Sequence, residues 1–112
     1  MPEDLADTVD PNELTVVTST EGDAGIVRAV GELDANSAPR LRAAFDELFE
    51  GEHPAVVVDL EGVSFIDSSG LSVLIAAYKQ ASARDVKLSL RSPSPAVTRL
   101  LEMTGQTERF LG

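Results

Sequence analysis

The sequence predicts a single α/β domain, and three features of the chain lead to that class. The chain has 112 residues, which is enough to bury one hydrophobic core but not two. Short β-branched runs alternate with segments whose apolar residues recur at helical spacing. No internal repeat or linker interrupts this order. Strands that alternate with helices pair in parallel through right-handed crossovers, so we expect an α/β fold.

The first part of the chain predicts a tail followed by a hairpin. Residues 1–13 are acidic and contain almost nothing to bury, so we expect a disordered acidic N-terminal tail. The folded domain is assigned to residues 14–112. It begins with two β-branched runs, "LTVVTST" and "IVRAVGEL", that the turn "EGDAG" separates. Two such runs around glycine and aspartate predict a β-hairpin.

The segment "DANSAPRLRAAFDELFEG" predicts the first helix. Asn36 or Ser37 can cap it, and Pro39 is tolerated in the first turn, where its missing N–H costs little. Apolar residues from Leu41 to Phe49 fall on one face. The run "PAVVVDL" follows and is continuously apolar, which predicts a strand that is buried on both faces and ends near Leu60.

The remaining elements are a second helix, a strand, a third helix and a final strand. The second helix is expected from about Ser68 to Ala83. The run "VKLSLRS" alternates and predicts a strand, and "SPSPAVTRLLEMTG" predicts a helix with Ser94 as cap and Pro95 in its first turn. The closing "TERFLG" is interpreted as a short strand. The core stripe of the second helix is predicted at Leu71, Leu74, Ile75 and Tyr78.

Composition excludes several classes of function. There is no cysteine, which rules out disulfides, thiolate metal sites and cysteine catalysis. The formal net charge of −10 and the absence of a basic run argue against a nucleic-acid partner, because phosphates are bound by lysine and arginine. No segment approaches the length of a membrane span, and the N-terminus does not resemble a secretory signal. We therefore expect a cytoplasmic protein without membrane insertion.

The stretch Asp67-Ser68-Ser69-Gly70 lies between a strand and the second helix. Asp67 can accept hydrogen bonds from the first free N–H groups of that helix, and its charge suits the helix dipole. Ser68 then has no evident capping role. Gly70 costs helix propensity, and one reason to accept this cost is to leave Ser68 open to another protein. The alternative is a redundant cap with a glycine that fits a tight corner.

This stretch does not have the features of a catalytic or metal site. A nucleophile elbow needs glycine before the serine, and a phosphate-binding loop needs G-x-x-x-x-G-K-S/T; neither occurs here. Asp67 is too weak a base to activate a hydroxyl, and the single histidine, His53, is interpreted as a surface loop residue. Asp34, Asp59 and Asp67 could in principle bind Mg²⁺, but aspartates at strand ends are usually turn formers. We therefore predict no enzyme activity, no cofactor and no metal.

Three segments together resemble a known family. They are "GELD" at 31–34, "VSFIDSSGLSVLIAAYKQ" after the apolar strand, and "SPAVTRLLEMTG" at 94–105. In order and approximate spacing they resemble the anti-sigma factor antagonists, the small bacterial STAS-domain proteins of sporulation and stress sigma-factor switches. The resemblance runs from about Leu14 to Gly105. It implies a STAS domain over residues 14–112, with a mixed β-sheet packed against helices and the first strand antiparallel at an edge of the sheet.

The resemblance also implies a mechanism of partner switching. In this family the serine directly after the motif aspartate, here Ser68, is phosphorylated by an anti-sigma factor that is itself a serine kinase. The unphosphorylated antagonist binds the anti-sigma factor and releases the sigma factor, phosphorylation ends that binding, and a serine phosphatase resets the switch. Residues around Ser68 are then expected to contact the partner, with Ser69 also starting the helix. These are Asp34, Asp67, Ser69, Gly70, Leu71 and Ser72.

One alternative function and one departure from the family pattern remain. The alternative is a STAS scaffold subunit of a stress-signalling complex or lipid transporter, which would act without phosphate cycling. The departure is at the C-terminus, where family members continue past the last strand with a helix and this chain stops at "ERFLG". We therefore expect the sheet to be less covered on one face, or to be covered by a dimer.

Overall fold

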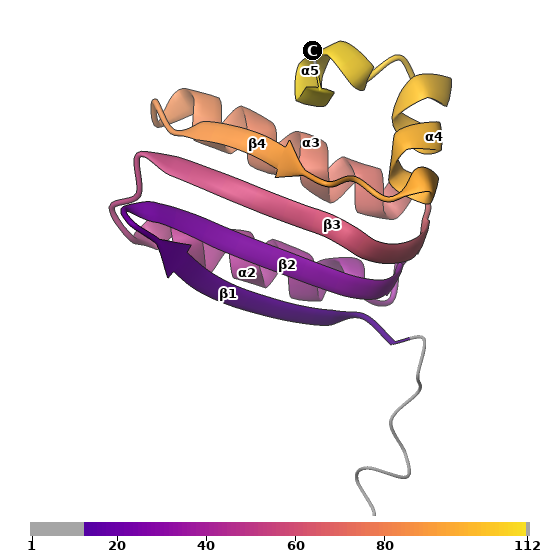
Figure 1. Ribbon diagram of the computed structural model, residues 1–112, viewed down its shortest axis with the longest axis horizontal. Coiled ribbons are helices and arrows are strands. Elements are labelled where there is room, and N and C mark those ends of the chain that lie inside the picture. Colours follow the sequence, from indigo (N-terminus) through magenta and orange to yellow (C-terminus); the bar gives the residue numbers. More distant parts are fainter. Residues whose placement is uncertain (1–12, 112) are drawn as a thin grey trace, which may run out of the picture.

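The computed structural model describes residues 13–111 as one α/β domain (Figure 1). The predicted acidic tail lies almost wholly outside the described residues. The elements are β1 (Thr15–Glu21), β2 (Ala24–Leu33), α2 (Ala38–Glu50), β3 (Ala55–Ile66), α3 (Ser68–Ala83), β4 (Lys87–Arg91), α4 (Pro95–Met103) and α5 (Thr107–Leu111).

The sheet is mixed, as predicted. Its four strands lie in the order β1-β2-β3-β4. β1 pairs antiparallel with β2, whereas β2 with β3 and β3 with β4 pair in parallel. The first strand is thus the antiparallel edge strand. The parallel pairs place the carboxyl ends of β2 and β3, and the beginnings of the helices that follow them, at one end of the sheet.

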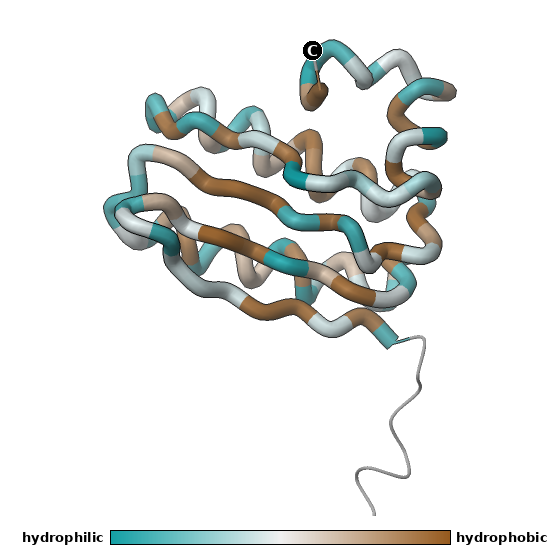
Figure 2. The backbone as a smooth tube through the Cα atoms, viewed as in Figure 1, coloured by the Kyte–Doolittle hydropathy of each residue, from teal (hydrophilic) through white to brown (hydrophobic). Residues whose placement is uncertain are grey.

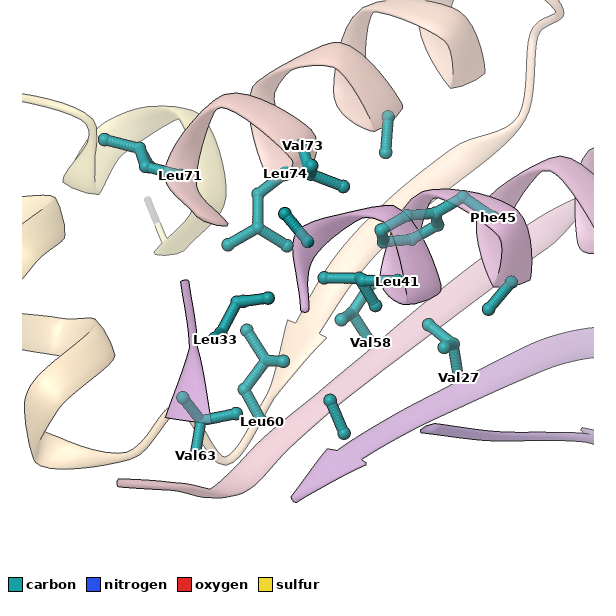
Figure 3. Packing of buried hydrophobic residues seen from close by; sticks show 14 of the residues in the cluster. Val27, Leu33, Leu41, Phe45, Val58, Leu60, Val63, Leu71, Val73 and Leu74 are labelled. Carbon is teal, nitrogen blue, oxygen red and sulfur yellow. The ribbon is translucent and has the colours of Figure 1, made fainter. Parts of the chain in front are cut away.

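Helices α2 and α3 cover one face of the sheet, and no described helix covers the other (Figure 1). In β3 the buried residues alternate with half-buried ones, so the expectation of a strand buried on both faces was wrong. Its apolar run is continuous (Figure 2) because the half-buried positions, such as Val57, also carry hydrophobic residues. Leu41, Phe45 and Leu74 of the helices pack over the strands in the core (Figure 3).

Strand β3 is longer than predicted. It continues past Leu60 to Ile66, although "EG" at 61–62 suggested a turn. Strand β3 stays paired with β2 over this length, with register shifts between Arg28 and Val30 and between Gly31 and Glu32. A Cβ atom at Gly62 would lie 2.9 Å from a methyl carbon of Val30. The glycine is therefore explained by close packing between neighbouring strands rather than by a turn.

The C-terminal segment was predicted as a strand but forms the short helix α5. Helix α4 ends at Met103. The helical turn of α5 brings Phe110 onto α3, where it meets Tyr78 edge to face at 5.6 Å between ring centroids. Phe110 is 8% exposed. The segment is too short to show a helical pattern of apolar residues in the sequence, and the burial of one aromatic ring decides its conformation. Two helices, α4 and α5, follow the last strand, so the expected lack of a helix there was wrong.

The core stripe of α3 agrees with the prediction and extends beyond it. Leu71 and Leu74 are buried, and Ile75 and Tyr78 pack partly buried against the core. Val73, Ala77 and Ala81 are buried as well. The helix is therefore apolar over a wider arc than one stripe, because it contacts α2, the sheet and the C-terminal helices.

Candidate functional site

The loop that begins at Asp34 and the turn Asp67–Gly70, which we call the serine turn, lie side by side at the end of the sheet. Leu33 and Ile66 are paired as the last residues of β2 and β3. Asp34 and Asp67 follow them directly, and the backbone N–H of Asp67 donates to the carbonyl of Leu33 at 3.2 Å. The two loops are therefore held together by the sheet itself. The expected proximity of Asp34 to the serine turn follows from this pairing.

Asp67 is the N-cap of α3, as predicted. Its Oδ1 atom accepts hydrogen bonds from the backbone N–H groups of Ser69 at 2.9 Å and Gly70 at 3.1 Å. The backbone at Asp67 is extended, which is the usual conformation at this position. The carboxylate thus satisfies two N–H groups that have no partner within the helix and places negative charge at its positive end.

Ser68 is exposed at the first position of α3. Its carbonyl accepts a hydrogen bond from Ser72 Oγ at 2.9 Å. Within residues 13–111 its own hydroxyl makes no hydrogen bond, whereas Asp67 carries the capping role. Ser68 therefore presents a hydroxyl to solvent on a backbone that the cap and the helix hold in place.

Gly70 and Leu71 are directed into the protein. A Cβ atom at Gly70 would lie 2.6 Å from Cγ of Leu33 and 2.9 Å from Cγ1 of Ile66. Internal packing therefore accounts for the glycine, and access to Ser68 is not needed to explain it. Leu71 is only 7% exposed and belongs to the core. Neither residue offers a surface that a partner could contact with a side chain.

Asp34 organises the turn that leads into α2. Its Oδ1 accepts hydrogen bonds from the backbone N–H groups of Asn36 at 3.0 Å and Ser37 at 3.1 Å. Ser37 occupies the N-cap position, but its buried hydroxyl makes no capping bond to the helix. It donates instead to the carbonyl of Glu32 at 2.8 Å. The expected side-chain cap by Asn36 or Ser37 is therefore absent, and Asp34 instead holds the turn that precedes the helix.

A hollow of about 350 Å³ lies between the first turns of α2 and α3. Pro39 and Arg42 line it from α2, and Ser69 and Ser72 line it from α3. The sequence pattern did not indicate Pro39 or Arg42 as part of the site. The parallel pairing of β2 with β3 could have done so, because it starts both helices at the same end of the sheet. Arg42 therefore places a positive charge beside the serine turn, in a protein whose net charge is −10.

The three aspartates considered for a Mg²⁺ site, Asp34, Asp59 and Asp67, have local roles. The Oδ1 atoms of Asp34 and Asp67 accept from backbone N–H groups of their own turns, and Asp59 Oδ1 accepts from the N–H of Glu61 at 3.1 Å. Among the described residues no group of three histidine or acidic side chains converges to hold a metal ion. Within the same residues no helix has the length and apolar character needed to cross a membrane.

Together, the fold and the site define a small α/β domain that presents an exposed serine at the start of a capped helix. A model of the STAS domain matches residues 15–111. The anti-sigma F factor antagonist of Paenibacillus polymyxa is 36% identical over 83 residues, which cover 71% of this chain and 69% of that protein.

Solved structures agree with these matches. An anti-sigma factor antagonist from Mycobacterium paratuberculosis has 28% identity and a TM-score of 0.82, covering 91% of this chain and 86% of that chain. The Bacillus cell fate determinant SpoIIAA in its phosphorylated form shares the fold, with 22% identity and a TM-score of 0.69 over 87% of this chain and 89% of that chain. The present chain belongs to the STAS-domain family of anti-sigma factor antagonists.

Proposed function

We propose that this protein is a cytoplasmic anti-sigma factor antagonist that phosphorylation of Ser68 switches off. In its unphosphorylated form it binds an anti-sigma factor with serine kinase activity, and the sigma factor is released. The observation that carries the proposal is the exposed hydroxyl of Ser68 at the first position of a helix that Asp67 already caps. The protein is a binding partner and a kinase substrate, not an enzyme, and a serine phosphatase restores it.

The position of Ser68 suits a switch that acts on binding rather than on folding. A phosphate adds about −1.5 to −2 charges at neutral pH. At a helix N-terminus that charge is favourable for the protein that carries it, because free N–H groups and the helix dipole point toward it. The fold can therefore accept the modification, while the added charge and bulk enter the surface that the partner contacts.

The surrounding surface strengthens this effect. The half-buried carboxylate of Asp67 is adjacent to Ser68, and the chain carries a net charge of −10. In a complex the phosphate would add bulk where the partner packs, and its charge would lose water while lying beside the Asp67 carboxylate, so both effects oppose binding. A coupling free energy of about 3 kcal/mol between phosphate and partner would weaken binding by about a hundredfold. Asp34, Ser69 and Ser72 lie around Ser68 and are proposed as further contacts.

The supporting relatives favour the same reading. A relative at 36% identity is an anti-sigma F factor antagonist, and SpoIIAA, which has the same fold, is known in a phosphorylated form. The family resemblance implies that the serine directly after the motif aspartate is the phosphate acceptor. Ser68 is also the more exposed of the two serines, whereas Ser69 is half-buried and its backbone N–H donates to the cap. We therefore assign the acceptor role to Ser68 rather than to Ser69.

The test uses the purified ATPase-type anti-sigma factor kinase of the same organism with Mg²⁺ and ATP. Wild type and Ser69→Ala are expected to gain a phosphate in intact-mass measurements, whereas Ser68→Ala gains none. Binding of Ser68→Glu is expected to be about a hundredfold weaker than that of Ser68→Ala, the matched neutral variant. If Ser68→Glu holds its partner as tightly as wild type, the scaffold alternative without phosphate cycling is the better account.

A further inference from the structure

An apolar groove lies between the end of β3 and helix α4 and measures about 460 Å³. We call it the Phe65 groove. In Figure 1, α4 stands beside the carboxyl end of β3. The lining side chains that carry the argument are Phe65 and Ile66 of β3 and Ala96, Arg99, Leu100 and Met103 of α4.

The groove exposes two large apolar side chains to solvent. Phe65 is 47% exposed, and Met103 is 74% exposed. Ile66 and Leu100 form a less exposed floor. Contiguous exposed apolar surface of this kind marks interaction sites, and aromatic and methionine side chains are enriched at the cores of protein interfaces. Neither Phe65 nor Met103 is explained by the packing of this chain alone.

The groove is continuous with the serine turn. Phe65 lies three residues before Ser68, so their Cα atoms are at most about 11 Å apart even along a fully extended chain. An interface of ordinary size buries about 800 Å² on each partner, which corresponds to a patch about 16 Å in radius. Phe65 is therefore within reach of a partner that centres an interface of this size on Ser68.

Charge decides against a second copy of this chain as the occupant. Each copy carries a net charge of −10, so two copies repel each other. Arg99 is the one charged side chain that lines the groove, and it makes no ion pair with another residue in the range 13–111. The groove thus suits apolar side chains with an acidic residue placed opposite Arg99.

We propose that the Phe65 groove is the phosphorylation-independent half of the anti-sigma factor interface. This inference rests on the proposed function and adds a second contact to it. The serine turn carries the part of the affinity that phosphate removes. The groove takes apolar side chains of the same partner, so the contribution of Phe65 and Met103 is insensitive to salt and to the state of Ser68.

The test measures binding of the full chain to the purified anti-sigma factor kinase. The variants are Met103→Gln and Phe65→Ser, with Val17→Gln as the matched control, because Val17 is 56% exposed on the opposite edge strand. Both groove variants are expected to raise Kd about tenfold at low and high salt. The same increase in Kd is expected in the Ser68→Ala background.

Kinetic assays of phosphorylation give a second readout for the variants that retain Ser68. The KM of the kinase for the groove variants is expected to rise, whereas its kcat is unchanged. Thermal unfolding confirms that each variant is folded, and Met103→Gln is the safer variant because its side chain is mostly exposed.

The outcomes separate the two proposals. If Met103→Gln and Phe65→Ser bind like Val17→Gln while Ser68→Glu loses binding, the groove proposal is overturned and the proposed function stands. A loss for Val17→Gln equal to that of the groove variants also overturns the groove as a specific contact. If the wild-type chain neither binds the kinase nor is phosphorylated by it, both proposals fall, because the groove is assigned to that partner.

Discussion

At the scale of the residue, position 70 shows how a helix start can be dictated by the strands before it. Gly70 lies in the first turn of α3, directly over Leu33 and Ile66, the paired ends of β2 and β3. Leu33 is fully buried, so it has no free space into which it could move. Position 70 is thus a glycine because the start of the helix approaches the ends of the two strands closely.

Replacement of Gly70 by alanine is predicted to destabilise the protein. Alanine is favoured over glycine in helices by about 1 kcal/mol. Here its Cβ would lie 2.6 Å from Leu33 Cγ, and overpacking of a tight core costs about 1–3 kcal/mol. The overlap outweighs the propensity, so urea denaturation should show a loss of about 1–2 kcal/mol. Ser72→Ala, one half-turn later and exposed, is the control and should change little. A stabilised Gly70→Ala would contradict the packing argument.

At the scale of the element, the ends of α3 and α4 use the same closing motif with different residues. Each ends with a residue at positive φ, Asp85 at 58° after α3 and Gly105 at 72° after α4. In both, the next residue donates its N–H back into the last turn, Val86 to Ala81 and Gln106 to Leu101, each at 2.8 Å. This left-handed position favours glycine. Only α4 has the preferred residue there.

Asp85→Gly is therefore predicted to stabilise the protein. The left-handed conformation costs a side-chain-bearing residue about 1 kcal/mol or more, and part of that gain is lost because glycine is more flexible when unfolded. The expected net gain in the free energy of unfolding is about 0.5 kcal/mol. The same change at Asp46, exposed within α2, should destabilise by a few tenths of a kcal/mol because its φ is helical. Equal effects at the two sites would rule out the motif as the cause.

At the scale of the whole molecule, one ion pair connects the two outer strands. Arg91 at the end of β4 donates two hydrogen bonds to Glu21 at the end of β1, at 3.1 and 3.2 Å. β1 and β4 are the opposite edges of the sheet, so the pair spans it. The hydrogen bond from Arg91 and its charge lower the pKa of Glu21, and those of Glu21 raise the pKa of Arg91.

This pair predicts a pH dependence of stability with a definite sign. The pKa of Glu21 is lower in the folded state than its ordinary value of 4.5. Its stabilising contribution is therefore fully present above that value and is lost as pH falls through the folded-state pKa. Thermal unfolding of wild type and Glu21→Gln should differ slightly at about pH 7, and the difference should shrink as pH falls below 4.5.

Salt and a second variant provide the control for this pair. Both side chains are exposed, so the difference between wild type and Glu21→Gln should shrink at high ionic strength. In the Arg91→Gln background the substitution at Glu21 should have no further effect, because the partner is gone. A difference that persists in that background would mean that Glu21 acts through another group.

Much of the fold could be predicted because its signals are local. The spacing of apolar residues in α2, α3 and α4 placed these helices, and the cap by Asp67 followed from an acidic side chain at a helix start. Three details could not be predicted in this way. Strand β3 continues through "EG" because Val30 packs against Gly62, α5 is helical because Phe110 reaches Tyr78, and Asp34 replaces Ser37 as the group that binds the turn before α2.

The sequence by itself determined the α/β class, the order of strands and helices up to α4, the capped start of α3 and the exposed position of Ser68. These features could be predicted because periodicity, capping and charge act between residues close along the chain. Only the tertiary structure decided which neighbours these residues have. Parallel pairing of β2 with β3 brings Asp34 beside the serine turn and sets Arg42 near Ser69. The docking of α4 leaves Phe65 and Met103 exposed in one groove, because contacts between distant segments form only when the sheet assembles.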